Sequence, residues 1–403
     1  MQIADRLKPL QTNVFADMDS AKASAIAAGK SILDLSLGSS DLPTPPHVLD
    51  AIAAALSDPD THGYALFNST RAFRVAAAQW AETKFGISVD PETEVLPLIG
   101  SQEGTAHLPL AVMNPGDVAL LLDPGYPSHA GGVYLAGGSI HPMPILAEND
   151  FLPVLSDIPA AVLANARMMV LSYPHNPTTA SAPLDFFKEA VAFCQQHNIV
   201  LVHDFPYADL FFEGKPVPSV LQADPDKSVS IEFFTLSKSY NMGGFRVGYA
   251  IGNAALIKAL RQVKATVDFN QYRGILRGAI AALTGPQDCV AQTVETFASR
   301  RNAAVSALQS IGWDVPMPDA TMYIWAKLPA TLPYDWAQRS IEFCTKLVAE
   351  TGVALSPGRG FGPSGEGYVR FALVHSPDEL RRAIEKMGDF ISQSSKDSMN
   401  KFN

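Results

Sequence analysis

Short apolar segments alternate with longer amphipathic ones from about residue 95 to about residue 252. The short segments are rich in Val, Ile, Leu and Phe, which predicts strands, whereas apolar positions spaced three or four residues apart predict helices. The predicted strands are Val118 to Leu122, Met168 to Tyr173, Ile199 to His203, Ile231 to Thr235 and Phe245 to Ile251, and the predicted helices include Glu103 to Met113 and Pro183 to His197. The alternation favours an α/β fold, with a mainly parallel sheet covered by helices on both faces.

The pattern changes after Thr284-Gly285-Pro286. A long helix, a strand and two further helices are predicted there, at Ala291 to Ile311, Met322 to Lys327, Asp335 to Thr351 and Ser376 to Ser392. Ser376 is a good N-cap for the last of these, followed by Pro377 in the first turn. We therefore expect a large domain at 46–284 and a smaller α+β domain that combines 285–403 with an N-terminal arm at 1–45.

Length and composition are compatible with two such units. The chain has 403 residues, of which 47% are hydrophobic, enough to fill two cores. Its net charge of -10 and the absence of a lysine or arginine block argue against nucleic-acid binding. Three cysteines, Cys194, Cys289 and Cys344, lie too far apart to indicate a disulfide framework or a zinc site.

The N-terminal sequence predicts no export. Residues 1–29 carry five charged side chains within the first 19 positions and contain no apolar core of a secretory signal. The chain also has no run of about 18 apolar residues, so we expect no membrane span and a cytoplasmic protein.

The most informative chemistry lies in the run from Phe234 to Gly248. Lys238 can bind an aldehyde covalently through its amine, and Thr235, Ser237 and Arg246 can hold a phosphate on the same molecule. A phosphorylated aldehyde that an enzyme holds in this way is pyridoxal 5'-phosphate. We take it as the candidate cofactor.

Polar residues that follow the predicted strands extend this site, because ligands bind at the carboxyl ends of parallel strands. Asp204 can hold a proton on a pyridine nitrogen, and Asn176 and Tyr207 offer donors to the ring phenolate oxygen. Tyr126 lies at another strand-to-helix turn, where its ring can stack on a flat cofactor. Taken singly, an aspartate after a strand is more often a turn residue, and a tyrosine such as Tyr126 or Tyr64 is more often a packed aromatic.

Two further parts of the sequence, one at a helix start and one in a strand, can be interpreted either as ligand-binding or as structural. Ser101 and Gln102, after Gly100, begin a predicted helix and can meet a phosphate there, although such a serine is more often only an N-cap. Arg370 lies within the apolar strand Gly367 to Leu373, where its charge needs a partner. That partner is either the carboxylate of a substrate or an internal salt bridge.

The segment Thr235 to Gly248 resembles the lysine signature of the class I/II aminotransferases, which are fold-type I pyridoxal-phosphate enzymes. The resemblance continues, in chain order, through Leu37-Gly38, Tyr64, Ser101, Tyr126, Asn176-Pro177, Asp204 to Tyr207, and Arg370. It is nearest to the alanine, aspartate and LL-diaminopimelate group. It implies a sheet of the seven-stranded type and a metal-free site in which Lys238, Asp204 and Tyr207 are catalytic.

The same resemblance implies a homodimer with shared active sites, in which Tyr64 of one subunit reaches the cofactor phosphate of the other. Arg370 would bind the substrate α-carboxylate, assisted by Asn176 and the backbone at Gly38. The expected reaction moves an amino group between an L-amino acid and a 2-oxo acid, with glutamate and 2-oxoglutarate as one pair and LL-diaminopimelate, alanine or aspartate among the other substrates.

Two other functions remain open at this point: a carbon–sulfur β-lyase using the same cofactor, and a non-catalytic binding module with an aminotransferase-like fold. Three positions also depart from common family patterns. Ser69 and Ala320 stand where glycine is frequent, and Gln102 where many relatives have lysine. The last difference bears on how a distal carboxylate of the substrate would be recognised.

Overall fold

The computed structural model describes residues 3–10, 14–333, 336 and 338–401. Seven strands form one sheet in the order β2-β8-β7-β6-β5-β3-β4. Their bounds are Val95–Leu98 (β2), Gly248–Gly252 (β8), Ser230–Thr235 (β7), Val200–Asp204 (β6), Ala166–Leu171 (β5), Val118–Asp123 (β3) and Ser139–Pro144 (β4). The strands β7, β6, β5, β3 and β4 pair in parallel, and β8 pairs antiparallel with both β7 and β2. This confirms the predicted α/β class and the mainly parallel sheet.

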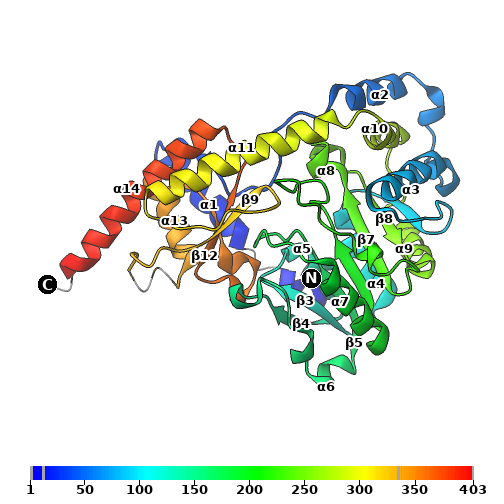
Figure 1. The fold of residues 1–403 in the computed structure, drawn as a ribbon, viewed down its shortest axis with the longest axis horizontal. Coiled ribbons are helices and arrows are strands. Elements are labelled where there is room, and N and C mark those ends of the chain that lie inside the picture. The colour runs from blue at the N-terminus through cyan, green and yellow to red at the C-terminus, as the bar shows by residue number, and fades with distance from the viewer. Residues whose placement is uncertain (1–2, 11–13, 334–335, 337, 402–403) are drawn as a thin grey trace.

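Helices cover both faces of this sheet (Figure 1). Successive strand residues point to opposite faces, so Phe234 belongs to the core beneath one set of helices and Phe233 to the core beneath the other. The first core includes residues of α3 (Arg71–Phe85), α7 (Leu184–His197) and α10 (Arg273–Thr284); α2 (Pro46–Leu56) also packs there. The second includes residues of α4 (Ser101–Val112), α5 (Pro127–Leu135) and α9 (Ala254–Val267).

A second group of elements lies to the left in Figure 1. Its three-stranded antiparallel sheet has the order β11-β12-β9, with bounds Ser356–Pro357, Tyr368–Ala372 and Tyr323–Lys327. A short parallel pair joins β1 (Leu33–Asp34) to β10 (Val353–Ala354). Around them pack α1 (Val14–Ala27), α11 (Asp288–Ser310), α13 (Ser340–Thr351) and α14 (Pro377–Lys401).

The long helix α11 connects the two groups. Its first turns, at Cys289 and Val290, pack against the core of the large sheet, while Phe297 and Leu308 lie in the core of the second group. Tyr207, from the turn after β6, is also part of that second core. Because α11 and Tyr207 contribute to both groups, the predicted domain boundaries at residues 46 and 285 stay a prediction.

Several element boundaries differ from those predicted. The strand expected at Phe245 begins only at Gly248, because Gly243–Phe245 forms a 3-10 turn and Arg246 adopts a left-handed conformation with φ of 51°. The strand expected to reach Tyr173 ends at Leu171. The last helix continues to Lys401 instead of ending at Ser392, and Asp335, where another helix was expected to begin, lies outside the described residues. No helix in the described part of the chain combines the length and the apolar character that spanning a bilayer requires.

Candidate active site

Lys238 lies at the carboxyl edge of the large sheet, directly after β7, on the one-turn helix α8 (Leu236–Ser239). Thr235, the last residue of β7, caps this turn: its hydroxyl accepts from the backbone N–H of Ser237 and donates to the Ser237 hydroxyl at 2.8 Å. The cap explains why the chain turns into a helix at this point. It also places Thr235, Ser237 and Lys238 together, as predicted.

The N-terminal segment folds over this lysine. The Nζ atom of Lys238 donates to the carbonyl oxygen of Gly38 at 2.6 Å, across 200 residues of sequence. The same Nζ lies 5.9 Å from the centre of the Tyr207 ring. The amine is therefore half-buried between Gly38 and the turn that follows β6, where a small carbonyl compound can reach it.

Asp204 ends β6 and is 5% exposed. One of its carboxylate oxygens, Oδ2, forms a hydrogen bond with His129 Nε2 at 3.0 Å. The other, Oδ1, is buried and has no hydrogen-bond partner within the described part of the chain. A buried acceptor without a donor is costly, so this oxygen is suited to receive a donor from a ligand.

His129 was not among the predicted site residues. It lies in the first turn of α5, three positions after Tyr126, and the two rings meet edge to face with centres 5.6 Å apart. The spacing of three residues on a predicted helix start was the available signal, because it places both side chains on one face. Burial raises the pKa of the Tyr126 hydroxyl, and the Asp204 carboxylate adds to the shift.

A second part of the site forms where α4 begins. Gly100 precedes the helix with φ of 75°, and a Cβ atom added to it would lie 2.6 Å from Nη2 of Arg246. A Cβ on Gly248 would lie 2.9 Å from the backbone nitrogen of Ser101. Two glycines thus allow the guanidinium of Arg246 and the first N–H groups of a twelve-residue helix to come together, which is an arrangement that binds anions.

Arg370, on β12, is 5% exposed, and all its hydrogen-bond partners are neutral. It donates to Asn176 Oδ1 (2.8 Å), the Ser36 carbonyl oxygen (2.7 Å) and Ser356 Oγ (3.1 Å), and its Nε is buried without a partner. Among the described residues no carboxylate lies within ion-pair distance of Arg370. The internal salt bridge considered above is therefore absent from this part of the chain, and the charge is available for an anionic ligand.

Tyr207 points toward Tyr323, a residue of β9 that the sequence analysis did not select. The Tyr207 hydroxyl donates to the Tyr323 hydroxyl at 3.0 Å. Burial raises the pKa of Tyr207 well above the usual value for tyrosine, and the neighbouring Tyr323 adds to the shift. Tyr207 is thus a neutral donor close to Lys238.

Four positions that the sequence analysis singled out do not contact this cluster within one chain. Tyr64 is 88% exposed and meets Phe269 edge to face at 6.3 Å. Gln102 is exposed on the first turn of α4. Ser69 donates to the Leu66 carbonyl oxygen nearby, and Ala320 is buried beside Phe211, so neither lies against Lys238 in the contacts described.

Glu103, His107 and Asp268 bring three donor atoms within 4.8 Å of one another, a spacing that a metal ion can use. The ammonium group of Lys264 already occupies this cluster, at 2.8 and 2.9 Å from the two Glu103 oxygens. Because the ammonium neutralises Glu103 and contacts both its oxygens, the cluster is a buried ion pair that joins α4 to α9.

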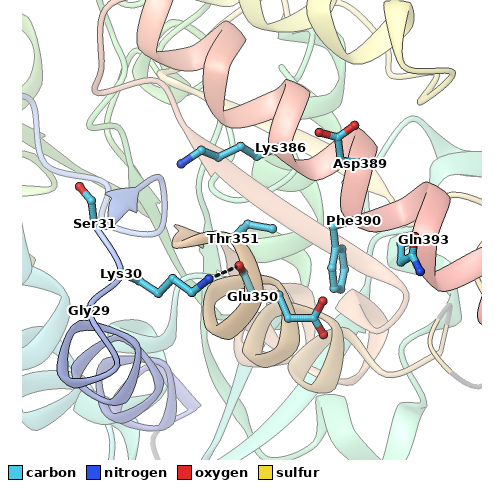
Figure 2. A pocket seen from close by; sticks show the side chains of 9 residues that line it. All are labelled: Gly29, Lys30, Ser31, Glu350, Thr351, Lys386, Asp389, Phe390 and Gln393. Carbon is cyan, nitrogen blue, oxygen red and sulfur yellow. Dashed lines mark hydrogen bonds between the residues drawn. The ribbon is translucent and has the colours of Figure 1, made fainter.

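A cavity of about 570 Å³ lies away from these residues, between the segment after α1, the end of α13 and the helix α14 (Figure 2). Lys30 closes one side by donating to the Glu350 carbonyl oxygen at 2.8 Å. The lining combines both signs of charge with the ring of Phe390, and none of the predicted site residues takes part. The candidate chemistry lies instead at the carboxyl edge of the large sheet and at Arg370 on β12.

The residues at that edge fit pyridoxal 5'-phosphate. Lys238 offers an amine, Asp204 a free carboxylate oxygen, and Arg246 with the start of α4 an anion site, while Arg370 adds a second anion site. The fold and this set of groups are those of the fold-type I pyridoxal-phosphate enzymes.

Comparison with known proteins identifies the family. The chain belongs to the class I and II aminotransferases, whose family model matches residues 30–387. An LL-diaminopimelate aminotransferase of Dehalococcoides mccartyi is 42% identical over 394 residues, covering 98% of this chain and 100% of that protein. The protein is therefore a pyridoxal-phosphate-dependent transaminase acting on amino acids and 2-oxo acids.

Two solved structures are similar to it. A probable N-succinyldiaminopimelate aminotransferase of Thermus thermophilus has 41% identity and a TM-score of 0.87, covering 93% of this chain and 99% of that one. Substrate-bound BacF of Bacillus subtilis has 32% identity and a TM-score of 0.91, covering 97% and 98%. These likenesses agree with the predicted fold and reaction class.

Proposed function

We propose that this transaminase acts on diaminopimelate or a close derivative of it, with 2-oxoglutarate and glutamate as the second pair. The names of the two relatives at 41% and 42% identity support this substrate class. The structural observation that supports an amino-acid substrate is Arg370, a buried guanidinium whose partners in the described part of the chain are neutral and which is therefore ready for an α-carboxylate.

In the proposed site, Lys238 would bind the cofactor covalently, and its phosphate would be held by Ser101, Gln102, Thr235, Ser237 and Arg246. Tyr126 would stack on the ring, and Asp204, oriented by His129, would accept the pyridine N–H through its free Oδ1. Asn176 and Tyr207 would donate to the phenolate oxygen. When bound, the cofactor supplies an acceptor for the electrons released at the substrate α-carbon.

The protein's own part in the reaction follows from these positions. Arg370, with Asn176 and the backbone at Gly38, fixes the substrate carboxylate, so that the bond from the α-carbon to its hydrogen points toward Lys238. The freed Nζ of Lys238 then accepts this proton. Its present hydrogen bond to Gly38 keeps the amine on the substrate side of the site.

We also propose that the active unit is a homodimer and that it works in the cytoplasm. An exposed apolar patch supports the dimer: Tyr64, Leu66 and Val267 are exposed, and Asn270 donates to the Ala65 carbonyl oxygen, which joins the two segments that carry them. In such a dimer Tyr64 would reach the cofactor phosphate of the second subunit.

A panel of amino donors with 2-oxoglutarate tests the substrate class. It includes LL-diaminopimelate, N-succinyl-LL-diaminopimelate, aspartate, alanine and an aromatic amino acid, each assayed for glutamate. We expect the highest kcat/KM for one of the two diaminopimelate compounds. A higher kcat/KM for alanine, aspartate or the aromatic donor would contradict the proposal, as would release of pyruvate and ammonia from cystathionine without an oxo acid.

A further inference from the structure

Tyr323 lies on the face of the small sheet that carries Arg370. In the antiparallel pair of β9 and β12, Trp325 is opposite Arg370 and Tyr323 is opposite Ala372, so Tyr323, Trp325 and Arg370 share one face. The Arg370 guanidinium lies 4.4 Å from the centre of the Tyr323 ring. Tyr323 is buried, and this stacking fixes its ring beneath the proposed carboxylate site.

The hydroxyl of Tyr323 touches both groups that contact Lys238. It accepts the hydrogen bond of the Tyr207 hydroxyl at 3.0 Å, and it lies so close to Gly38 that a Cβ atom there would be 2.1 Å away. Gly38 in turn accepts from Lys238 Nζ at 2.6 Å. The phenol oxygen of Tyr323 therefore lies against both Gly38, which bonds the amine, and Tyr207, whose ring centre is 5.9 Å from that amine.

The electrostatic surroundings of the two phenols differ. Burial acts to raise the pKa of Tyr323, but the charges of Lys238 and Arg370 and the hydrogen bond from Tyr207 outweigh it and lower that pKa. Burial instead raises the pKa of Tyr207. The charged and titratable groups that face the pair are Lys238 on α8, Arg370 on β12 and Tyr126 before α5. Tyr323 is consequently the more acidic phenol of the pair.

We propose that Tyr323 is a positioning residue that acts through Tyr207 and Gly38: its hydroxyl supports the Tyr207 hydroxyl as a donor and sets the position of the Gly38 carbonyl group at Lys238. A phenol can donate one hydrogen bond and accept others. When Tyr207 turns its proton toward the phenolate oxygen of the cofactor, Tyr323 can donate to Tyr207, and a hydrogen-bond chain of this kind strengthens each of its members. This inference rests on the roles proposed above for Lys238 and Tyr207.

Tyr323→Phe tests the proposal, because it removes the hydroxyl and keeps the ring beneath Arg370. The readout is the pH midpoint of the visible absorbance change of the lysine-bound cofactor in purified holoenzyme. A weaker donor at the phenolate oxygen favours the protonated chromophore, so we expect the midpoint to rise by about half a pH unit to one unit. We expect kcat to fall by about threefold to tenfold, with little change in the KM of the amino donor.

A double-mutant comparison separates positioning from a structural effect. Tyr207→Phe should raise the midpoint further than Tyr323→Phe does, and the double variant should match Tyr207→Phe alone, because the effect of Tyr323 on the midpoint passes through Tyr207 and its contact with Gly38 bears on kcat. Tyr368→Phe is the matched control: it removes a phenol hydroxyl from β12, where the ring stacks on Trp325, and should leave the midpoint unchanged. Thermal unfolding of each variant is measured in parallel.

An unchanged midpoint in Tyr323→Phe would overturn the inference, and so would shifts that simply add in the double variant. Failure of the proposed function has a different signature. In that case the wild-type protein would have no visible cofactor band, or Lys238→Ala would still be labelled covalently by the cofactor after borohydride reduction.

Discussion

The guanidinium of Arg370 is buried among an amide, a carbonyl and a hydroxyl group, with no counter-charge in the described part of the chain. A substrate carboxylate would supply that counter-charge through hydrogen bonds worth about 1.5–3 kcal/mol. We expect Arg370→Ala to raise the KM of the amino donor by about 10- to 100-fold and to leave cofactor affinity within about twofold. Steady-state kinetics and equilibrium dialysis of pyridoxal phosphate measure the two effects. If only the cofactor affinity fell, Arg370 would have a structural role and would not bind the substrate carboxylate.

Lys238 lies directly after β7 at the carboxyl edge of the large sheet, and its Nζ donates to the Gly38 carbonyl oxygen. We expect Lys238→Ala to abolish covalent attachment of pyridoxal phosphate, because no other amine replaces it at that position. Borohydride reduction followed by mass spectrometry of the intact protein detects the attachment. Lys215→Ala, which removes an exposed lysine paired with Asp319, is the control and should keep it. Attachment that persists in Lys238→Ala would remove this residue from its role.

Several of the site residues that the sequence predicted follow strands. Lys238, Asp204 and Tyr126 come after apolar runs, and parallel strands bring such positions to one edge. His129 and Tyr323 were missed because their partners are distant in sequence: Asp204 is 75 residues from His129, and Tyr207 is 116 residues from Tyr323. Such long-range contacts depend on tertiary packing, which a single sequence does not define.

The turn between β2 and α4 depends on a glycine. Gly100 has φ of 75° and ψ of 156°, a conformation open essentially only to glycine and worth about 1–3 kcal/mol of strain to a side chain, and a Cβ there would also meet Arg246. Gly116 has φ of 95° and nothing within 4 Å of its added Cβ. We therefore expect both Gly100→Ala and Gly116→Ala to lose stability in urea unfolding, and Gly100→Ala to lose at least as much. Only Gly100→Ala should weaken pyridoxal phosphate binding, by about tenfold. If the two variants bound pyridoxal phosphate with equal affinity, Arg246 would not be part of the phosphate site.

Helices and strands could be predicted from the sequence where apolar residues recur at a regular spacing and a clear capping residue marks the end of the element. Ser376 caps α14 as expected: its hydroxyl accepts from the backbone N–H of Glu379 at 3.3 Å, and the Glu379 carboxylate accepts from the backbone N–H of Ser376 at 3.0 Å. Strand β4 was missed because it contains Pro142 and Pro144, which are tolerated only at the edge of a sheet, and it is indeed the last strand. The start of β8 was misplaced because Arg246 is left-handed, a conformation set by its turn and not by apolar pattern.

At the scale of the whole molecule, the expected cofactor site is incomplete within the described part of a single chain. The phosphate end near Arg246 and the start of α4 is open, since Arg246 and Gln102 are exposed. Tyr64, which the family resemblance places at a cofactor phosphate, is 88% exposed in its own chain. A closed dimer with a twofold axis would cover the apolar patch around Tyr64 and Leu66 and bring each Tyr64 to the other subunit.

Mixing two inactive variants tests this shared site. In a heterodimer of Tyr64→Ala and Lys238→Ala subunits, the Lys238 of the first subunit would meet the Tyr64 of the second, which completes one site, and the other site would lack both side chains. We therefore expect transaminase activity to appear when the two purified variants exchange subunits, although each alone is impaired. Native mass spectrometry with one tagged subunit verifies the exchange. Proven heterodimers without recovered activity would place Tyr64 in the site of its own chain, since the only subunit with an intact lysine would then carry the Tyr64→Ala change.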